Sequence, residues 1–466
     1  MQLHDLLDGV EVRAVLGPTV TDVASVTRDS RAVERGSLFC CIPGARVDGH
    51  DFAAEAVAAG AVAVLVDHEL HLEAPVTQVV VDDVRGAVGL VAAALHGHPS
   101  RSIDVVGITG TNGKTTTAWL LRSVLEAAGR STEMIGTLTS RPGGPPTTPD
   151  AIELQAELAQ MRDRGVTAVA MEVSSHALAQ SRVEGTEFAV AVFTNLSRDH
   201  LDYHETMEDY FAAKALLFEP ARSRRAVVNV DDPRGRLLLD AARIPTRGFS
   251  LDDVSDLRVG KTSSGTWRGQ RLDVPFAGAF NVSNALAAAN AALDLGIDEA
   301  TIVRGIATAP PAPGRFELVD AGQPFLVAID YAHTPDGIEH LLESARRLAD
   351  DGQVTIVFGA GGDKDRGKRP LMGAVASQLA DVVVLTSDNP RSEDPMAIID
   401  DIRAGMAGPA YVIAEPDRRA AIELALARAT AGDIVVVAGK GHETTQTIGD
   451  DEIPFDDRLV VKDLLT

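Results

Sequence analysis

A glycine-rich turn between a buried strand and a helix constrains the fold of this chain more than any other feature. The run GITGTNGKTTT (Gly107–Thr117) overlaps the end of the apolar stretch Ile103–Ile108 and precedes a helix-like run, AWLLRSVLEAAG. Glycines let the backbone curl so that its N–H groups face phosphate oxygens, and the helix N-terminus adds partial positive charge. Lys114 supplies a mobile cation, and the hydroxyl of Thr115 or Thr116 can bind Mg²⁺. The segment predicts a nucleotide phosphate loop in an α/β sheet.

The strict GxxxxGK[ST] pattern is not met, because Ile108 stands where its first glycine should be. An ordinary glycine-rich turn between strand and helix is therefore the alternative. The preceding strand, the Gly-Lys-Thr core and the following helix favour phosphate binding. We expect the nucleotide to contact Gly110, Thr111, Asn112, Gly113, Lys114, Thr115 and Thr116.

Composition excludes several other classes of protein. The 466 residues carry 43 Lys and Arg against 67 Asp and Glu, a net charge of −24, which repels nucleic acid and anionic membranes. No apolar run approaches the roughly 18 residues that a membrane span needs, and the N-terminus lacks the apolar segment of a signal peptide. The adjacent Cys40 and Cys41 fit no metal-binding spacing and are expected to be small core residues. We expect a cytoplasmic protein with small-molecule substrates.

Apolar runs that alternate with helical patterns divide the chain into three α/β units. We place them at residues 1–97, 98–317 and 318–466, with boundaries at HPSRS (His98–Ser102) and at PPAPGRFE (Pro310–Glu317). Expected strands lie at 37–44, 61–67, 77–83, 103–108, 166–173, 188–195, 225–231, 354–359, 381–387 and 433–439. The apolar runs of the second unit are typical of buried parallel strands.

The loop GTNGKTT resembles the ATP loop of the Mur ligases and of the related folylpolyglutamate synthases, and the resemblance extends over essentially the whole chain. The Mur ligase resemblance implies three domains. These are a small α/β uridine-nucleotide-binding domain, a central P-loop ATPase-type parallel sheet and a Rossmann-like C-terminal domain. It also implies an ATP-dependent ligase that forms amide bonds, and we expect it to be a monomer.

A set of metal-binding residues follows from the same resemblance. Glu172 ends an expected parallel strand, so its carboxylate points into the ligand crevice, where it and Thr115 suit an Mg²⁺ shared with ATP. His200 and Lys214 would ordinarily be structural or solvated residues. In the family, the histidine of the DH motif helps to bind a second Mg²⁺, and the lysine of AAK is carbamylated. The apolar neighbours of Lys214 favour a depressed pKa, and its neutral amine could then react with CO₂.

The resemblance implies further nucleotide contacts in the second half of the chain. Asn281 in FNVSNALAA is the expected adenine contact, although Asn281 or Ser283 could instead be the N-cap of a helix. Arg315 lies near the hinge between the second and third units and could clamp the γ-phosphate when the units close. Asp330 and His333 in DYAHTPD would reach the ribose and phosphates, with turn formation or helix capping as the alternative for Asp330. ATP would convert a substrate carboxylate into an acyl phosphate, which an incoming amine attacks, with positioning supplying most of the rate.

The N-terminal unit distinguishes among relatives. TRDSR (Thr27–Arg31) and GARVDGHDF (Gly44–Phe52) resemble uridine-nucleotide-binding segments, with Ser30 as the expected diphosphate contact. Folylpolyglutamate synthases start close to their phosphate loop, whereas about a hundred residues precede it here, which argues against them. The muramoyl-dipeptide is expected to contact Thr147, Thr148, Ser174, Gln180 and Arg182.

The amino-acid substrate is predicted from SDNPRSEDP and AGKGHE. In the family, the DNPR motif marks enzymes that accept meso-diaminopimelate, and Arg391 can pair with a distal carboxylate that lysine lacks. Gly439 and Glu443 would hold the distal ammonium, or they could form a turn that opens a helix. The expected amino-acid contacts are Lys364, Asp388, Asn389, Pro390, Arg391, Gly439 and Glu443.

The predicted reaction adds meso-diaminopimelate to the D-Glu carboxylate of UDP-N-acetylmuramoyl-L-Ala-D-Glu. One departure leaves lysine or another diamino acid open, because Lys364 stands where diaminopimelate enzymes usually have arginine, and Arg366 is the residue that could compensate. A folate-type ligase and a non-catalytic nucleotide-binding protein are the remaining alternatives. The latter is disfavoured because Lys114, Glu172, His200 and Lys214 are all present.

Overall fold

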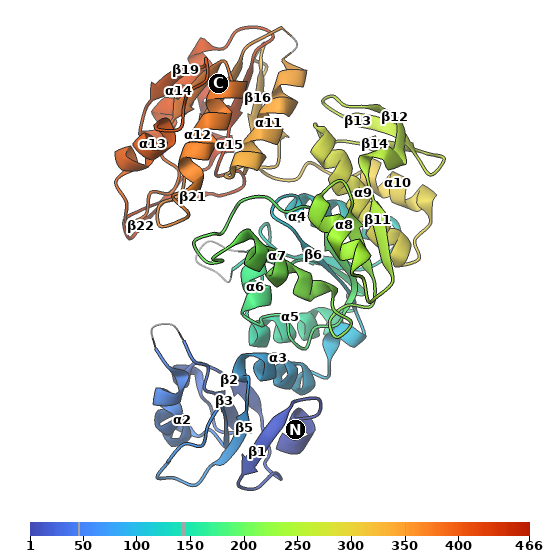
Figure 1. Ribbon diagram of the computed structural model, residues 1–466, viewed down its shortest axis with the longest axis vertical. Coiled ribbons are helices and arrows are strands. Elements are labelled where there is room, and N and C mark those ends of the chain that lie inside the picture. The colour runs from blue at the N-terminus through green and yellow to red at the C-terminus, as the bar shows by residue number, and fades with distance from the viewer. Residues whose placement is uncertain (45–46, 141–145, 350) are drawn as a thin grey trace.

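Three α/β units follow one another along the long axis of the molecule (Figure 1). The computed structural model describes residues 1–44, 47–140, 146–349 and 351–466. The N-terminal unit lies at one end, the central unit carries the phosphate loop, and the C-terminal unit lies at the other end. The sequence-based α/β prediction is therefore confirmed, while the domain boundaries at 97 and 317 stay predictions.

The N-terminal unit is built on a five-stranded sheet of order β1-β5-β4-β3-β2, parallel except for the pairing of β1 with β5. Cys40 and Cys41 are buried on opposite faces of this sheet as free thiols, as expected of small core residues. The unit contains α1 (Leu3–Leu6), β1 (Val12–Leu16), β2 (Ser25–Thr27), η1 (Ser30–Ala32), β3 (Ser37–Cys40), η2 (Gly49–Phe52), α2 (Ala53–Ala59), β4 (Ala63–Val66), β5 (Thr77–Val81), α3 (Val84–Leu95) and η3 (Pro99–Arg101).

The central unit is a six-stranded parallel sheet of order β11-β10-β9-β6-β8-β7. Helices α4 and α9 cover one face through an alanine-rich core, and α5 covers the other. The strands and helices are β6 (Asp104–Thr109), α4 (Lys114–Ala127), β7 (Thr132–Ile135), α5 (Ala151–Asp163), β8 (Ala168–Glu172), α6 (Ser175–Ala179), β9 (Phe188–Phe193), α7 (Met207–Ala215), η4 (Leu216–Phe218), β10 (Ala226–Asn229), α8 (Pro233–Asp240), β11 (Thr246–Phe249), η5 (Leu251–Asp253), α9 (Ala279–Asp294) and α10 (Glu299–Ala307). A small antiparallel sheet, β12 (Val254–Arg258), β13 (Ser263–Trp267) and β14 (Gln270–Val274), precedes α9.

The C-terminal unit holds a second six-stranded sheet, of order β15-β16-β20-β17-β18-β19, parallel except at β15. Its elements are β15 (Glu317–Leu318), β16 (Leu326–Ile329), α11 (Pro335–Leu348), β17 (Val354–Phe358), α12 (Lys368–Leu379), β18 (Val382–Leu385), α13 (Pro395–Arg403), β19 (Tyr411–Ala414), α14 (Arg418–Arg428), β20 (Ile434–Val437), β21 (Thr445–Ile448), β22 (Asp451–Pro454) and α15 (Asp457–Leu465). Strands β21 and β22 form a separate hairpin.

Among the described residues, every helix is too short or too polar to cross a bilayer. The parallel sheets place the carboxyl ends of their strands toward the crevice between the central and C-terminal units, and ligands of open α/β sheets bind at such ends.

Candidate active site

A cavity of about 870 Å³ lies where the central and C-terminal units meet. The phosphate loop, the carboxyl end of β8, the loop after β9 and the N-terminus of α9 contribute its central wall. The segment before β15, the loop after β16 and the start of α11 contribute the opposite wall. Predicted residues that line it are Thr111, Asn112, Gly113, Lys114, Thr115, Thr116, Thr147, Glu172, Ser174, Arg182, His200, Arg315, Asp330, His333 and Lys364.

The phosphate loop is held in its curled form by neighbours that leave no room for a side chain. Gly110 and Gly113 have φ angles of +150° and +85°. A Cβ atom on Gly110 would lie 1.9 Å from Oγ1 of Thr194, and one on Gly113 would lie 2.3 Å from Oδ1 of Asn284. The backbone N–H of Asn112 donates to the side chain of Asn195, the residue after Thr194 (2.9 Å). The loop therefore depends on glycine for both its dihedral angles and its packing.

The side-chain nitrogens of two lysines point at the same carbonyl oxygen of this loop. Nζ of Lys114 and Nζ of Lys214 each lie 2.9 Å from the carbonyl oxygen of Gly110. Lys214 comes from α7, is 1% exposed, and has its amine 4.5 Å from the ring centre of Tyr210. Burial, and then the charge of Lys114, hold the pKa of Lys214 well below its ordinary value. The expected depression of this pKa is confirmed, and a neutral amine at Lys214 is the form that burial favours.

Glu172 lies among hydroxyl oxygens of the kind that surround a hard cation. Its carboxylate is fully buried and accepts hydrogen bonds from Oγ1 of Thr115 (2.9 Å), the backbone N–H of Thr137 (2.8 Å) and Oγ1 of Thr137 (3.1 Å). A buried carboxylate beside threonine hydroxyls at the start of a phosphate-binding helix fits an Mg²⁺ that also contacts ATP. The donor set therefore suits the metal that the sequence predicts.

His200 lies on the rim of the cavity in a cluster of imidazole rings. Its ring meets that of His176 edge to face at 4.8 Å, and its backbone has a φ of +56°. Burial lowers the pKa of His200 to about 3 and that of His176 to about 4. Both rings are therefore neutral near pH 7, and a neutral imidazole nitrogen is the form that binds a metal.

Asp199, which sequence reasoning missed, joins the two units beside His200. Nζ of Lys368 from α12 lies 3.2 Å from Oδ1 of Asp199, and Nε2 of His333 lies 3.8 Å from Oδ2. Burial opposes ionisation, but Lys368, His333 and His200 together hold the pKa of Asp199 well below its usual range. Asp336 makes a second link, because its Oδ2 accepts from Nδ2 of Asn112 (2.7 Å).

Arg315 reaches the phosphate loop from the segment between the units. Its Nη2 donates to Oγ1 of Thr115 (3.0 Å), and its guanidinium lies 4.4 Å from the ring centre of Tyr331. Nε of Arg315 is buried without a hydrogen-bond partner among the residues that the structure describes. A buried donor of this kind is costly unless a ligand atom meets it, which suits a phosphate oxygen.

Asp330 and His333 flank this arginine from the C-terminal unit. Oδ2 of Asp330 accepts from the N–H of Phe316 and Oδ1 accepts from the N–H of Ala332, each at 2.7 Å. The carboxylate therefore makes the turn contacts that were the alternative for Asp330, and burial raises its pKa. Both residues line the cavity.

The N-cap alternative for Asn281 and Ser283 is wrong, because α9 begins at Ala279 with Gly278 as its N-cap. The amide of Asn281 is buried, donating to the carbonyl of Ala277 (2.8 Å) and accepting from Asn284 (3.2 Å). Ser283 and Asn284 line the cavity, whereas Asn281 lies behind them. Its contact with adenine stays a prediction.

A second hollow, of about 830 Å³, lies where the N-terminal unit meets the central unit. Ser30 and the rest of TRDSR line it, together with Phe52. Two residues of the other predicted uridine segment, Ala45 and Arg46, lie outside the described residues.

Asp150 connects this hollow with the main cavity. Its carboxylate pairs with Arg28 of the hollow and, at 2.9 Å, with Nε of Arg182 of the cavity. Nη2 of Arg182 also donates to Oε1 of Gln180 (2.6 Å), and Oγ1 of Thr148 donates to the carbonyl of Glu172 (3.0 Å). The predicted dipeptide residues are thus brought together around Arg182.

The predicted amino-acid residues form a cluster at the carboxyl ends of β18 and β20. Nδ2 of Asn389 donates to Oε2 of Glu443 (2.8 Å), and a Cβ on Gly439 would lie 2.4 Å from Oδ2 of Asp388. Pro390 continues this loop to Arg391. No helix follows β20 directly, so the alternative of Glu443 in the first turn of a helix is wrong.

Arg391 lies at the edge of this cluster. Its Nη1 donates to the carbonyl of Gly362 (2.8 Å), and its backbone has a φ of +51°. Lys364 is exposed at the cavity wall, and Arg366 pairs with Glu393 instead of turning toward it.

Sequence reasoning also missed Lys440, which is fully buried. Its Nζ donates to Oε2 of Glu443 (3.0 Å) and to Oδ1 of Asn389 (3.2 Å). Its place inside AGKGHE was a usable signal, because a lysine that closely follows a buried strand needs a partner.

Comparison with known proteins gives this geometry a family. Three family models match successive parts of the chain. They are described as Mur ligase family, catalytic domain (residues 22–98), Mur ligase middle domain (108–292) and Mur ligase, glutamate ligase domain (314–441). The chain belongs to the Mur ligase family. The predicted resemblance is thereby confirmed, and the three large sheets of the structure correspond to the three domains of Mur ligases.

Two Mur ligase relatives show how far the similarity extends. A Streptomyces avermitilis protein named UDP-N-acetylmuramoyl-L-alanyl-D-glutamate–2,6-diaminopimelate ligase is 47% identical over 478 residues, covering 95% of this chain and 92% of its own. A Syntrophomonas wolfei protein of the same name is 43% identical and covers 100% of this chain and 99% of its own.

Solved structures of Mur ligase relatives have the same fold as this chain. A structure of a ligase of that name has a TM-score of 0.71 at 35% identity, covering 100% of this chain and 98% of that chain. Mycobacterium tuberculosis folylpolyglutamate synthase shares the fold, with a TM-score of 0.61 at 22% identity, but it covers 75% of this chain and 91% of that chain.

Proposed function

We propose that this Mur ligase joins meso-diaminopimelate to the D-Glu carboxylate of UDP-N-acetylmuramoyl-L-Ala-D-Glu, with hydrolysis of ATP to ADP and phosphate. The observation that supports this proposal most is that Arg315 and Glu172 both bond to the hydroxyl of Thr115, while Lys114 lies against the same phosphate loop. In addition, the chain aligns almost end to end with ligases named for this reaction. A phosphoryl group needs cations around it and a carboxylate-held metal beside it, and this crevice has the cationic side chains and a carboxylate that would hold the metal.

The reaction divides into two transfers. A carboxylate oxygen of the substrate attacks the γ-phosphorus of ATP, the bond to the bridging oxygen breaks, and ADP leaves. The amine then attacks the acyl carbon, phosphate leaves with the former carboxylate oxygen, and the amine loses a proton. Lys114 and Arg315 neutralise charge on the phosphoryl group, and closure at Asp199–Lys368 excludes water from the acyl phosphate.

Glu172 and Thr115 would hold one Mg²⁺, and His200 and Lys214 a second. Bound Mg²⁺ supplies charge neutralisation for the phosphates. Lys214 suits a carbamate because its neutral Nζ can bond to the carbon of CO₂ and release a proton, which places a carboxylate beside the phosphate loop.

The two hollows match the two ends of the sugar-nucleotide substrate. We assign the uridine diphosphate end to the hollow around Ser30 and the dipeptide end to Ser174 and Arg182 in the main cavity. Adenine would lie against Phe280 and Ser283 at the start of α9, with Asn281 behind them. We further propose that the chain acts as a cytoplasmic monomer, with domains divided near residues 97 and 317.

Diaminopimelate is favoured over lysine by Arg391 and by the names of the relatives. A bidentate pair between a guanidinium and the distal carboxylate would be left unmade by lysine. In the cluster of Asn389, Lys440 and Glu443, the carboxylate of Glu443 and the amide oxygen of Asn389 would then bind the distal ammonium.

An amino-acid panel tests this proposal. ADP release would be followed with ATP, UDP-N-acetylmuramoyl-L-Ala-D-Glu and, in turn, meso-diaminopimelate, L-lysine or no amino acid. We expect turnover only with diaminopimelate. Turnover that prefers lysine would overturn the assignment of the amino acid, and no turnover with any diamino acid would overturn the ligase itself.

The role of Arg391 has a matched control in Arg403, an exposed arginine on α13. Losing a charged hydrogen-bond pair of about 1.5–3 kcal/mol should raise the KM for diaminopimelate about 10- to 150-fold in Arg391→Ala. Arg403→Ala should leave the KM unchanged. An equal KM in both variants would place the distal carboxylate elsewhere.

A further inference from the structure

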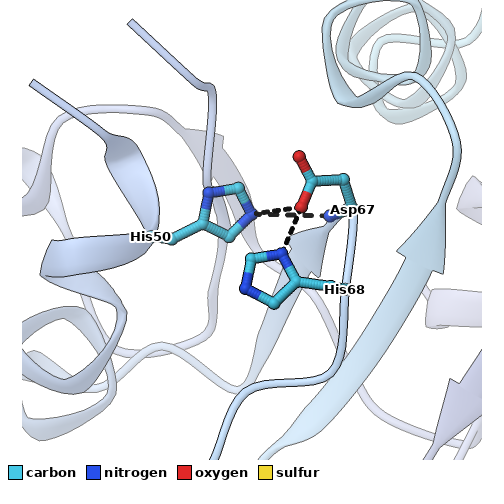
Figure 2. A group of neighbouring side chains, drawn as sticks. All are labelled: His50, Asp67 and His68. Atoms are coloured by element: carbon cyan, nitrogen blue, oxygen red, sulfur yellow. Dashed lines mark hydrogen bonds and ion pairs between the residues drawn. The ribbon is translucent and has the colours of Figure 1, made fainter.

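Far from the ATP cavity, two histidines and an aspartate of the N-terminal unit turn their side chains toward one point (Figure 2). His50 comes from η2, whereas Asp67 and His68 directly follow β4. Nε2 of His50 lies 3.3 Å from Oδ1 of Asp67, and Nδ1 of His68 pairs with the same oxygen atom. The two imidazole rings stack with their centres 4.8 Å apart. One carboxylate oxygen therefore faces two imidazole nitrogens.

Hydrogen bonds to both ring nitrogens fix the orientation of the His50 side chain. Its Nδ1 lies 2.6 Å from Oδ1 of Asp48, and the backbone N–H of Asp67 points at its Nε2 (3.4 Å). These contacts assign the hydrogen to Nδ1 and the lone pair to Nε2, where a bound metal would replace the long contact with the N–H of Asp67. Histidines that bind metals are usually held in this way, with the far ring nitrogen donating to a carboxylate. The side chain of His50 is 6% exposed, so this orientation is well constrained.

The spacing of these atoms matches the edge of a tetrahedral metal site. Ligands about 2.0–2.1 Å from Zn²⁺ at tetrahedral angles lie about 3.3–3.4 Å from each other. The separation of 3.3 Å between Nε2 of His50 and Oδ1 of Asp67 has this value. His68 is 61% exposed, so its ring can rotate to complete the third edge without disturbing the core. The exposed side leaves room for water as a further ligand.

The donor set selects the class of metal. Two imidazole nitrogens and one carboxylate oxygen suit Zn²⁺ and neighbouring first-row ions, whereas Mg²⁺ and Ca²⁺ prefer sites made mainly of oxygen ligands. The surroundings of Glu172 in the ATP cavity are rich in oxygen and therefore suit Mg²⁺. The two places should therefore bind different metals.

We propose that His50, Asp67 and His68 form a site for a divalent transition metal, with Zn²⁺ the best fit. The bound ion ties η2 to the end of β4. Phe52 belongs to the same η2 turn and lines the hollow that contains Ser30. The metal thus stiffens one wall of that hollow, whatever ligand the hollow takes.

Zinc binding to the full-length chain, first freed of metal by a chelator, tests the proposal. Zinc per chain would be measured after dialysis, and affinity by competition with a chromophoric chelator. We expect one equivalent of Zn²⁺ to be lost in His68→Ala and in Asp67→Asn. It should be kept in the control His71→Ala, which removes an exposed histidine three residues away. Because His68 is exposed, its removal leaves the fold intact, which circular dichroism would verify.

Two further variants distinguish this site from zinc bound at histidines elsewhere in the chain. Asp48→Asn should weaken zinc binding about 10- to 100-fold, the usual effect of removing a carboxylate that orients a metal-bound histidine. His176→Ala removes a histidine of the ATP cavity and should keep the equivalent that His68→Ala loses. Equal zinc content in the wild type and His68→Ala would overturn the proposal. So would loss of the wild type's only equivalent in His176→Ala.

Discussion

The buried ion pair between Lys368 and Asp199 should control how well the central and C-terminal units close. Nζ of Lys368 lies 3.2 Å from Oδ1 of Asp199, and the two side chains are 8% and 6% exposed. Lys368→Met removes the charge and keeps most of the apolar stem. In the closed form, the buried Asp199 would then lose its ammonium partner and keep the imidazoles of His200 and His333 beside it.

The expected magnitude follows from this geometry. Removing one partner of a buried pair typically costs about 3–5 kcal/mol, because the other charge is left uncompensated. Two imidazoles stay close, and opening the units lets water reach Asp199, so we expect about 2–3 kcal/mol. This corresponds to a fall in kcat/KM of about 30- to 150-fold. Each unit keeps its own core, so the thermal unfolding midpoint should change little.

Steady-state ADP release in a double-mutant cycle measures this effect. Lys368→Met, Asp199→Asn and the double variant would be compared, with Lys462→Met on the exposed face of α15 as the control. The double variant leaves no unpaired charge and should be more active than the product of the two single effects predicts. Strictly multiplicative effects, or a Lys368→Met enzyme within threefold of the wild type, would refute the reasoning.

Three other predictions concern the loop, the lysine and pH. Lys214→Ala should lower kcat at least about 100-fold, the usual effect of losing one electrostatic group of an active site, and acetate or formate should restore part of it. Failure of every short acid to restore activity would contradict a carboxylate role. Gly113→Ala should weaken ATP binding far more than the control Gly129→Ala, because Gly129 also has a positive φ but has open space around it. Equal ATP affinities of the two variants, measured by calorimetry, would contradict the steric argument. Burial lowers the pKa values of His176 and His333 to about 4, so the unfolded chain binds more protons than the folded one between pH 4 and about 6.5. Their contribution to stability is complete above about pH 6.5 and is lost toward pH 4, so the urea midpoint should fall on acidification and fall less in His333→Gln.

The sequence predicted the buried parallel strands because these are continuous apolar runs between turns. Strands such as β6 and β17 are buried along their length, and every one of the ten expected runs contains a strand. The small sheet β12–β14 was not predicted, because its exposed polar residues give no apolar run. The edge strand β19 was also missed, because its four residues are too short an apolar run to stand out in the sequence.

The site was predictable where a local motif carries the chemistry and not where the tertiary fold does. Lys114 closely follows one strand and Glu172 ends another, and the carboxyl ends of these strands meet at one edge, so the sequence places the two residues together. Asp199 and Lys368 lie 169 residues apart, and only the closure of the two units joins them. A local motif can also mislead. Asn281 stands in a clear motif, but its amide makes hydrogen bonds within the protein.

The carboxylate of Asp150 has a consequence for how a long substrate is sensed. It pairs with Arg28 on one side and Arg182 on the other, so the two arginines share this counter-ion. If an acidic group of the substrate pairs with Arg182, Asp150 can pair more strongly with Arg28. This strengthens the contact between the N-terminal and central units. Occupancy at the peptide end would thereby be reported to the nucleotide end by electrostatics alone, without movement of the sheets.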